Sequence, residues 1–219
     1  MPSQKNNPMP LADELQCGID RLGLSVSRDT QMQLLDYLAL LVRWNKVYNL
    51  TAIRDPGQMV IHHLLDSLAV LPYLEGVRWL DVGSGAGLPG LVLAIAKPDC
   101  AVTLLDSNSK KTGFMQQAVI ELGLANVQVC CARVEDFQPA EKFDGIISRA
   151  FTELGDFLRV TRHLIRDQGR WIAMKGLPEA ELPGVPTDCL IEKIIPLSVP
   201  GLNAARCLVI ATLRKDHLP

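Results

Sequence analysis

The sequence predicts an α/β protein in which a helical segment precedes a mostly parallel sheet of seven strands. Apolar residues recur at helical spacing through the first 75 residues, and from residue 77 strand-like and helix-like segments alternate. The last two strand-like segments have no helical pattern between them, which indicates an antiparallel hairpin at the sheet edge. We therefore expect a disordered tail at residues 1–10, a helical extension at 11–75 and one compact domain at 76–219.

Three helices are expected before the sheet. The first lies within Leu11–Leu22 and ends at Gly23, a residue that favours helix C-termini. Ser27 can cap the second, whose apolar stripe consists of Leu34, Leu35, Leu38, Leu41 and Val42. The third follows Pro56 and spans about Gly57–Leu71. These helices have apolar faces that must pack on the rest of the chain.

Alternating segments define the domain that follows. The expected strands are Val77–Val82, Ala101–Asp106, Val127–Cys131, Phe143–Ser148, Arg170–Met174, Leu190–Ile195 and Arg206–Leu213. The intervening helices are expected within Leu88–Ala96, over Ser109–Leu122, and along an apolar stripe from Leu154 to Ile165. Because βα units of this kind form parallel sheets, helices should cover both faces.

Composition narrows the class of protein. The chain has 219 residues, 48% hydrophobic and 21% charged, with a net charge of −2. A mainly disordered chain is excluded, and no run approaches the roughly 20 apolar residues that a membrane span needs. The charge argues against coating bulk nucleic acid. Six cysteines show neither a CxxC pair nor metal-ligand spacing. We expect a cytoplasmic monomer without a metal.

A glycine-rich loop, Asp81–Gly90 (DVGSGAGLPG), follows the first strand. Ligands of open α/β sheets bind at the carboxyl ends of the strands, so a cofactor should lie here. Gly85, Gly87 and Gly90 satisfy G-x-G-x-x-G, which is typical of dinucleotide binding. An aspartate two residues before the first glycine gives D-x-G-x-G-x-G instead, the pattern of S-adenosylmethionine (SAM) methyltransferases. Asp81 can orient the loop and approach the amino group of the methionine moiety.

Two further positions at strand ends can contact a nucleoside cofactor. Asp106 ends the second strand, where a carboxylate can accept both hydroxyls of a ribose in either NAD or SAM. Val134 and Glu135 follow the third strand, where methyltransferases contact the adenine. Without further information, the sequence around Glu135 favours a solvated loop over a cofactor contact.

Missing motifs restrict the methyl acceptor. Methylation of an exocyclic amine usually uses [DN]PP[YF] after the fourth strand, where this chain has Ser148–Phe151 (SRAF). Pyrimidine C5 methylation needs a nucleophilic cysteine near that point; Cys130 and Cys131 lie in the third strand and are expected in the core. N7 of guanine has a lone pair and no proton, so alignment with the sulfonium methyl can suffice.

The motifs together resemble the RsmG family, also called GidB (glucose-inhibited division protein B). The resemblance runs from about residue 30 to the C-terminus, with its motifs in order on the expected elements. They are WNKVYNLTAIRD (Trp44–Asp55), HHLLDSL (His62–Leu68), LDVGSGAGLPG (Leu80–Gly90), LLDSNSKK (Leu104–Lys111), RVEDF (Arg133–Phe137), ISRAF (Ile147–Phe151) and AMKG (Ala173–Gly176).

The resemblance implies a class I SAM-dependent methyltransferase, Rossmann-like, with a helical N-terminal extension. It also implies methyl transfer from SAM to N7 of the guanine at position 527 of bacterial 16S rRNA, within the small ribosomal subunit. By the family's motifs, SAM would be contacted by Gly83, Leu88, Val134, Glu135 and Arg149, supported by Asp81, Gly85 and Asp106.

Several charged residues have both a structural and a functional interpretation. Arg149 could form a salt bridge at a strand end or anchor the cofactor or a phosphate. The candidates for RNA contact are Lys110, Lys111, Arg133 and Lys175. Gly113 stands where the family pattern usually has another basic residue. His63 and Asp66 are three apart on a helix and could form a hydrogen-bonded pair; this chemistry needs no histidine base.

Two other classes of protein remain open at this point. A noncatalytic ribosome-assembly protein could retain a SAM pocket, although such a relic should have lost cofactor residues. An NAD-dependent oxidoreductase would share G-x-G-x-x-G and the acid after the second strand. Against it, no separate catalytic domain is evident and Asp81 would have no obvious purpose.

Overall fold

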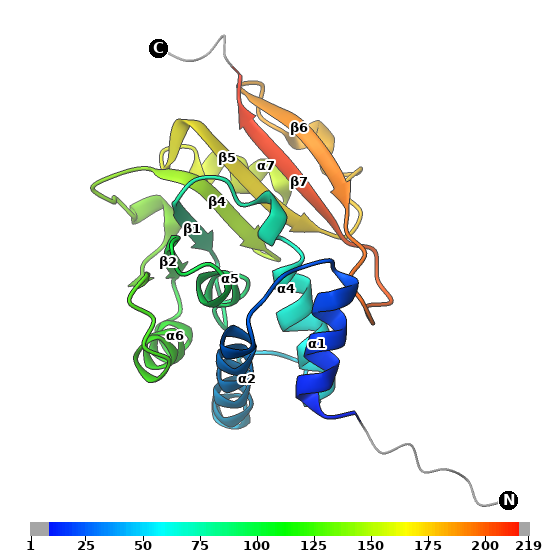
Figure 1. Cartoon of the computed structure of the whole chain (residues 1–219). Helices are drawn as coiled ribbons and strands as arrows, with labels where there is room; N and C mark the ends of the chain where they lie inside the picture. The colour runs from blue at the N-terminus through cyan, green and yellow to red at the C-terminus, as the bar shows by residue number, and fades with distance from the viewer. Residues whose placement is uncertain (1–8, 215–219) are drawn as a thin grey trace, which may run out of the picture.

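Seven strands form one sheet in the order β3-β2-β1-β4-β5-β7-β6 (Figure 1). The chain is described by a computed structural model over residues 9–214; most of the expected N-terminal tail, residues 1–8, lies outside the described residues. Strands β1 to β5 pair in parallel, while β7 pairs antiparallel with both β5 and β6. The expected antiparallel edge hairpin is confirmed. The order of strands reverses at β1: β2 and β3 follow on one side of it, and β4 and the later strands lie on the other side.

Six strands lie close to their expected positions, and the fifth begins earlier. The strands are β1 (Arg78–Val82), β2 (Ala101–Asp106), β3 (Val127–Cys131), β4 (Phe143–Arg149), β5 (Ile165–Lys175), β6 (Cys189–Pro196) and β7 (Cys207–Leu213). The helix expected to reach Ile165 ends at Thr161 as α7 (Leu154–Thr161). Ile165 instead pairs with Phe143 of β4, and both side chains are fully buried. Ile165 is therefore apolar because it is buried in the sheet, although its position also continues the helical spacing of α7.

The N-terminal helices follow the sequence except at the third. The first two are α1 (Leu11–Arg21), which is followed by Gly23 at φ +68°, and α2 (Arg28–Tyr48), where the Ser27 hydroxyl accepts a hydrogen bond from the Thr30 amide at 3.1 Å. The third is interrupted. It comprises α3 (Pro56–Met59), a π-helical segment η1 (Val60–Leu65) and α4 (Asp66–Leu68), followed by the 3₁₀ turn η2 (Leu71–Tyr73).

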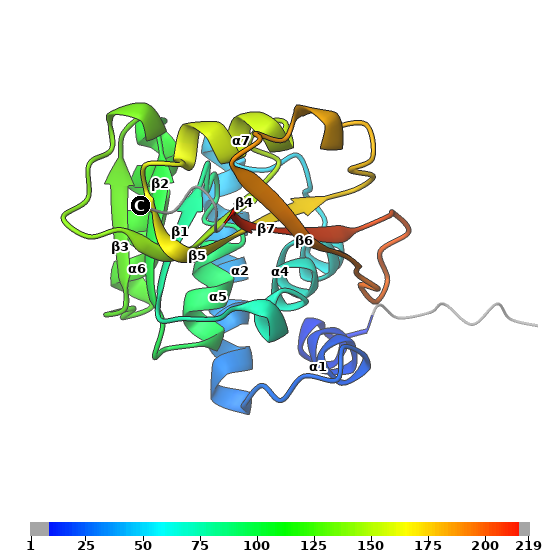
Figure 2. The ribbon, with the colours of Figure 1, turned by 90° about the horizontal axis from the view of Figure 1, so that it is seen from above.

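Helices cover both faces of the sheet (Figure 2). One face packs against α5 (Gly90–Ala96), α6 (Ser109–Glu121) and the N-terminal helices, in a core that joins Leu15, Leu41 and Leu64 to Leu104 and Ile147 of the sheet. The other packs against α7 and the 3₁₀ turns η3 (Val134–Asp136) and η4 (Leu182–Gly184). The helical extension therefore shares its core with the sheet.

The two cysteines of β3 are less buried than the sequence predicts. Cys131 is exposed and Cys130 only half-buried, so the expectation of core positions is wrong for Cys131, which is the last residue of the edge strand β3. In the part of the chain that the structure describes, no helix is long and apolar enough to cross a membrane.

Candidate active site

The loop between β1 and α5 is held against β2 by a serine. The hydroxyl of Ser84 donates to the carbonyl of Asp81 at 2.8 Å and accepts from the amide of Leu105 at 3.1 Å. The Gly83 amide donates to the Leu105 carbonyl at 2.8 Å. Gly83 has φ +70°, a left-handed conformation that costs a residue with a Cβ roughly 1–2 kcal/mol. These contacts fix the loop and leave Gly83 facing a cavity.

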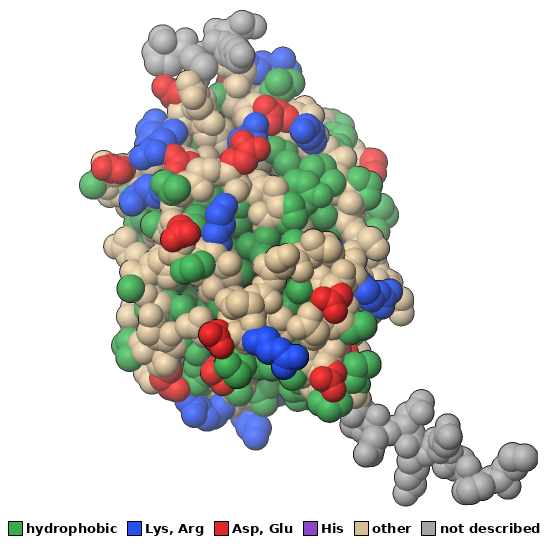
Figure 3. All heavy atoms as spheres, viewed as in Figure 1, with side chains coloured by type: hydrophobic (Ala, Val, Ile, Leu, Met, Phe, Trp, Pro, Cys, Tyr) green, Lys and Arg blue, Asp and Glu red, His purple; other side chains and the backbone are tan. Residues whose placement is uncertain are grey.

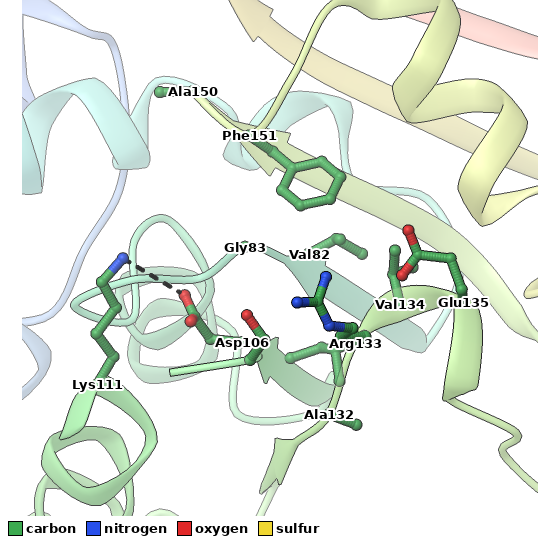
Figure 4. Close-up of a pocket in the computed structure, with 12 residues that line it drawn as sticks. Val82, Gly83, Asp106, Lys111, Ala132, Arg133, Val134, Glu135, Ala150 and Phe151 are labelled. Carbon is green, nitrogen blue, oxygen red and sulfur yellow. Dashed lines mark ion pairs between the residues drawn. The ribbon is translucent and has the colours of Figure 1, made fainter. Parts of the chain in front are cut away.

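That cavity lies over the carboxyl ends of β1 to β4 and has a volume of about 300 Å³. This is at the lower end of the range for small-molecule sites. Figure 4 shows its walls, with Phe151 on one side and Asp106 and Lys111 on the other. The lining residues are Val82, Gly83, Leu105, Asp106, Ser107, Lys111, Ala132, Arg133, Val134, Glu135, Ala150 and Phe151. Four of the eight expected cofactor residues are among them.

Asp106 connects the glycine loop to the end of β2. Its Oδ2 accepts a hydrogen bond from the Gly85 amide at 2.9 Å, and its Oδ1 accepts one from the Asn108 amide at 2.9 Å. The Lys111 ammonium lies 3.9 Å from Oδ2. Asn108 caps α6, accepting from the amides of Lys110 and Lys111. Asp106 is thus free of the capping role and faces the cavity.

Asp81 lies behind the loop rather than in the cavity wall. The side chain is fully buried; Oδ2 accepts from the Gly90 amide at 2.9 Å, while Oδ1 has no hydrogen-bond partner among the described residues. Burial raises the pKa of Asp81 to about 7, against the opposing effects of the Gly90 amide and of Arg149. An unsatisfied buried oxygen of this kind is suited to a cationic group of a ligand.

Replacing Asp81 by asparagine should remove a contribution that lowers the stability of the fold as the pH rises from about 4 to 7. The ordinary pKa of an aspartate is 3.8, and the pKa of Asp81 in the folded protein is about 7. Between these two pH values the folded state retains a proton that the unfolded chain has released. The contribution of Asp81 to stability therefore falls as the pH rises through this window, by up to about 1.4 kcal/mol per pH unit. The variant has no such proton, so its free energy of unfolding should rise relative to that of the wild type as the pH increases over the same window. Denaturant unfolding of both proteins at several pH values measures the difference.

His63 acts in the opposite direction, and the comparison removes its contribution. Burial, with Arg149 nearby, lowers the pKa of His63 to about 4, so this group contributes stability above pH 6.5 that is lost as the pH falls toward 4. Both proteins contain His63, so its effect cancels in the difference. Parallel pH profiles for wild type and Asp81→Asn would contradict the raised pKa of Asp81.

The end of β3 supplies a second wall of the cavity. Val134 is buried, whereas Arg133 and Glu135 are exposed at the rim, and all three belong to or precede η3. The expected positions after the third strand are therefore brought to the same cavity as Gly83 and Asp106. Their meeting follows from the parallel order of β1, β2 and β3, whose carboxyl ends share one edge.

The segment after β4 contributes two residues that the sequence analysis did not place in the site. Ala150 has φ +56°, an uncommon conformation for a residue other than glycine. It directs Phe151 over Gly83, where a Cβ added to the glycine would lie 2.6 Å from the Phe151 ring. Phe151 is 37% exposed. Their position at the carboxyl end of a strand was the available signal for both residues.

Arg149, the last residue of β4, is turned toward the helical extension. Its Nη1 donates to the Asp66 carboxylate at 3.1 Å and to the His62 carbonyl at 2.8 Å. The expected hydrogen bond between His63 and Asp66 is wrong: His63 Nε2 lies 3.0 Å from the Thr51 hydroxyl, and both oxygens of Asp66 accept from arginines instead. Arg149 does not line the cavity, although the next two residues do.

The other expected residues have mixed positions. Leu88 is buried in the core and Gly85 bonds to Asp106, so both shape the loop rather than line the cavity. Lys111 and Arg133 line the cavity, and Lys110 is exposed on α6. Lys175 donates to Glu181 and to the Thr152 carbonyl, both at 2.7 Å, which connects the end of β5 to the segment before η4.

The fold and the site define a class of protein. A glycine loop after β1, a carboxylate at the end of β2 and a cavity over four strand ends, in a sheet with this order and a single antiparallel strand between β5 and β6, are those of a class I SAM-dependent methyltransferase. The residues present fit the cofactor, since Gly83 leaves room for close approach and Asp81 offers an unpaired oxygen.

Comparisons with known proteins agree with this class. The fold is similar to that of TrmN from Thermus thermophilus, with a TM-score of 0.55 and 20% identity over 68% of this chain and 47% of that one. It is also similar to a SAM-dependent methyltransferase from Aquifex aeolicus, with a TM-score of 0.54 and 20% identity over 73% of this chain and 94% of that one.

The family model for GidB, described as rRNA small subunit methyltransferase G, matches residues 30–209, and the chain belongs to this family. It is 53% identical to ribosomal RNA small subunit methyltransferase G of Laribacter hongkongensis over 94% of this chain and 100% of that protein. The protein of the same name from Pseudomonas aeruginosa is 55% identical over 91% of this chain and 94% of that protein. The resemblance found in the sequence motifs is confirmed.

Proposed function

We propose that this chain is an rRNA methyltransferase that transfers the methyl group of SAM to N7 of guanine 527 in the 16S rRNA of the small ribosomal subunit. Membership of the GidB family over residues 30–209 is the observation that carries the proposal. The choice of N7 and of this guanine follows the family resemblance of the motifs. The reaction would take place in the cytoplasm with the monomer as the working state.

The cofactor would be held by residues at four strand ends. SAM, when bound, supplies an electrophilic methyl group. Gly83 would let it approach the loop, Asp106 would accept from the ribose, and Arg149 would act near its methionine end. The full proposed set is Asp81, Gly83, Gly85, Leu88, Asp106, Val134, Glu135 and Arg149, of which Gly85 and Leu88 act by shaping the loop.

The lining of the cavity suits an acceptor atom that carries no proton. Among its described residues are two carboxylates, Asp106 and Glu135, and neither a histidine nor a cysteine. N7 of guanine needs no general base, because its lone pair is available for direct attack. The chain's contribution would then be alignment of the acceptor with the methyl group and exclusion of water, in which Phe151 covers one wall.

Contacts to RNA would come mainly from the rim of the cavity. Lys111 and Arg133 line it, and Lys110 lies beside Lys111 at the start of α6, so these three can meet phosphates near the target base. Lys175 would act more by holding the nearby loop through Glu181. On the face seen in Figure 3, basic and acidic side chains are interspersed rather than gathered by sign. Binding would therefore depend on a structured target more than on bulk charge.

The test is methyl transfer from labelled SAM to small ribosomal subunits from a strain that lacks this gene. We expect label in 7-methylguanine at a single position, identified by mass spectrometry of the 16S rRNA. Free 16S rRNA, assayed in parallel, distinguishes naked RNA from the assembled subunit as substrate. Label in another base, or in no RNA, would overturn the proposal.

Two alternatives predict different outcomes of binding and transfer. A noncatalytic SAM-binding assembly protein would bind SAM and the subunit without transferring label. An NAD-dependent oxidoreductase would retain NAD rather than SAM in ultrafiltration. The family match over residues 30–209 favours the methyltransferase over the oxidoreductase, and the intact glycine loop favours it over a noncatalytic relic.

A further inference from the structure

A fully buried carboxylate connects the helical extension to the end of β4. Asp66, at the start of α4, has no exposed surface. Its Oδ2 accepts from Arg149 at 3.1 Å, and its Oδ1 accepts from Arg206 at 3.2 Å. The three residues come from separate parts of the chain: the helical extension, β4, and the segment just before β7.

Asp66 fixes one corner of the Arg149 guanidinium. Nη1 makes both contacts with the extension, to Asp66 and to the carbonyl of His62 at 2.8 Å. Among the described residues, Nε and Nη2 of Arg149 make no hydrogen bond, and the side chain is 20% exposed. A guanidinium held at one nitrogen in this way keeps its other donors in a set direction.

The held side chain lies next to the cavity. Arg149 is followed directly by Ala150 and Phe151, which both line it. The positive charge of Arg149 also acts on Asp81 behind the glycine loop, where it opposes the rise in the pKa of that carboxyl. A change in the direction of Arg149 would therefore be felt on the side of the cavity where β1 and β4 lie together.

We propose that Asp66 is a positioning residue for the cofactor: it holds Arg149, through Nη1, in the orientation that binds the methionine end of SAM. This rests on the proposed function, because it takes Arg149 as a cofactor contact. Asp66 itself touches no reacting atom. Arg206 donates to the second oxygen of Asp66, so both oxygens of this buried carboxylate are paired with arginines and Asp66 stays in place.

The test is a double-mutant cycle on the dissociation constant for SAM, measured by calorimetry with the full-length wild type, Asp66→Asn, Arg149→Gln and the double variant. Asparagine keeps the shape of Asp66 and removes its charge. We expect Asp66→Asn to weaken SAM binding about tenfold, the size typical of a charge-assisted hydrogen bond. In the Arg149→Gln background the same change should have no further effect. A purely structural role would give equal losses in both backgrounds.

A matched control lies at the other end of the same strand. Asp144 of β4 is paired with Arg166, far along the strand from the cavity, and Asp144→Asn should leave SAM affinity within twofold of the wild type. If Asp66→Asn does not fold, the cycle is run with Asp66→Glu, which keeps the charge and displaces it by one methylene. A smaller loss that again disappears in the Arg149→Gln background supports the proposal.

The outcomes separate the two proposals. An unchanged dissociation constant for Arg149→Gln contradicts the cofactor role of Arg149, and with it this inference. A weakened Arg149→Gln beside an unchanged Asp66 variant overturns the positioning role alone. Equal losses with and without Arg149 also overturn it.

Discussion

Replacing Gly83 by aspartate should abolish SAM binding and methyl transfer together. Gly83 has φ +70°, and its Cβ would lie 2.6 Å from the ring of Phe151, so the side chain has no room in the present arrangement. The new carboxylate would also enter a cavity that already has Asp106 and Glu135 in its wall. The strained backbone alone costs roughly 1–2 kcal/mol; with the clash, we expect SAM affinity to fall at least about 100-fold.

Calorimetry with SAM and transfer of label to small subunits measure this loss. The matched control is Gly113→Ala on α6, where nothing lies within 4 Å of the added Cβ. That variant should bind SAM as the wild type does and gain up to about 1 kcal/mol in stability, because alanine favours a helix over glycine. Wild-type affinity in Gly83→Asp would mean that the glycine loop does not hold the cofactor.

Trp171→Ala should lower the free energy of unfolding by about 3–5 kcal/mol, more than Asp81→Asn, Gly113→Ala or Ile194→Ala. Trp171 lies in the middle of β5, is fully buried, and packs in the core beneath α7. Its indole Nε1 donates to the hydroxyl of Thr161 at 2.8 Å, and that hydroxyl donates to the Phe157 carbonyl at 2.6 Å. Removing the ring leaves a cavity and an acceptor without its donor.

Denaturant unfolding of the wild type and Trp171→Ala gives the difference in free energy. Ile194→Ala on the edge strand β6 is the control, since this side chain is 41% exposed and its truncation should cost less than about 1.5 kcal/mol. A loss below that size in Trp171→Ala would show that the layer under α7 adds little to stability. SAM affinity of the folded fraction should remain, because Trp171 does not line the cavity.

Elements set by local signals could be predicted from the sequence. Ala101–Asp106 and Val127–Cys131 coincide with β2 and β3, and Ser27 and Gly23 bound their helices as expected. Apolar alternation and capping depend on neighbouring residues alone. The end of α7 was missed, because Ile165 continues a helical spacing while its partner, Phe143, belongs to another strand.

Half of the expected cofactor residues line one cavity for a general reason. Gly83, Asp106 and Val134 lie at or just beyond the ends of three parallel strands, and the carboxyl ends of such strands meet at one edge. The position of each residue after its strand was therefore enough to group them. Ala150 and Phe151 satisfy the same rule after β4, and only the left-handed turn at Ala150 brings the Phe151 ring over Gly83.

The sequence by itself determined the class of fold, the family and the residues at the strand ends, because motif spacing and periodicity are local properties. The partners of Asp66 were decided only by the tertiary structure. Arg149 lies 83 residues away and Arg206 lies 140 residues away, and local spacing pointed to His63 instead. A buried carboxylate pairs with whichever guanidinium groups the packed elements bring within hydrogen-bond distance, so its partners follow from how the helical extension docks on the sheet.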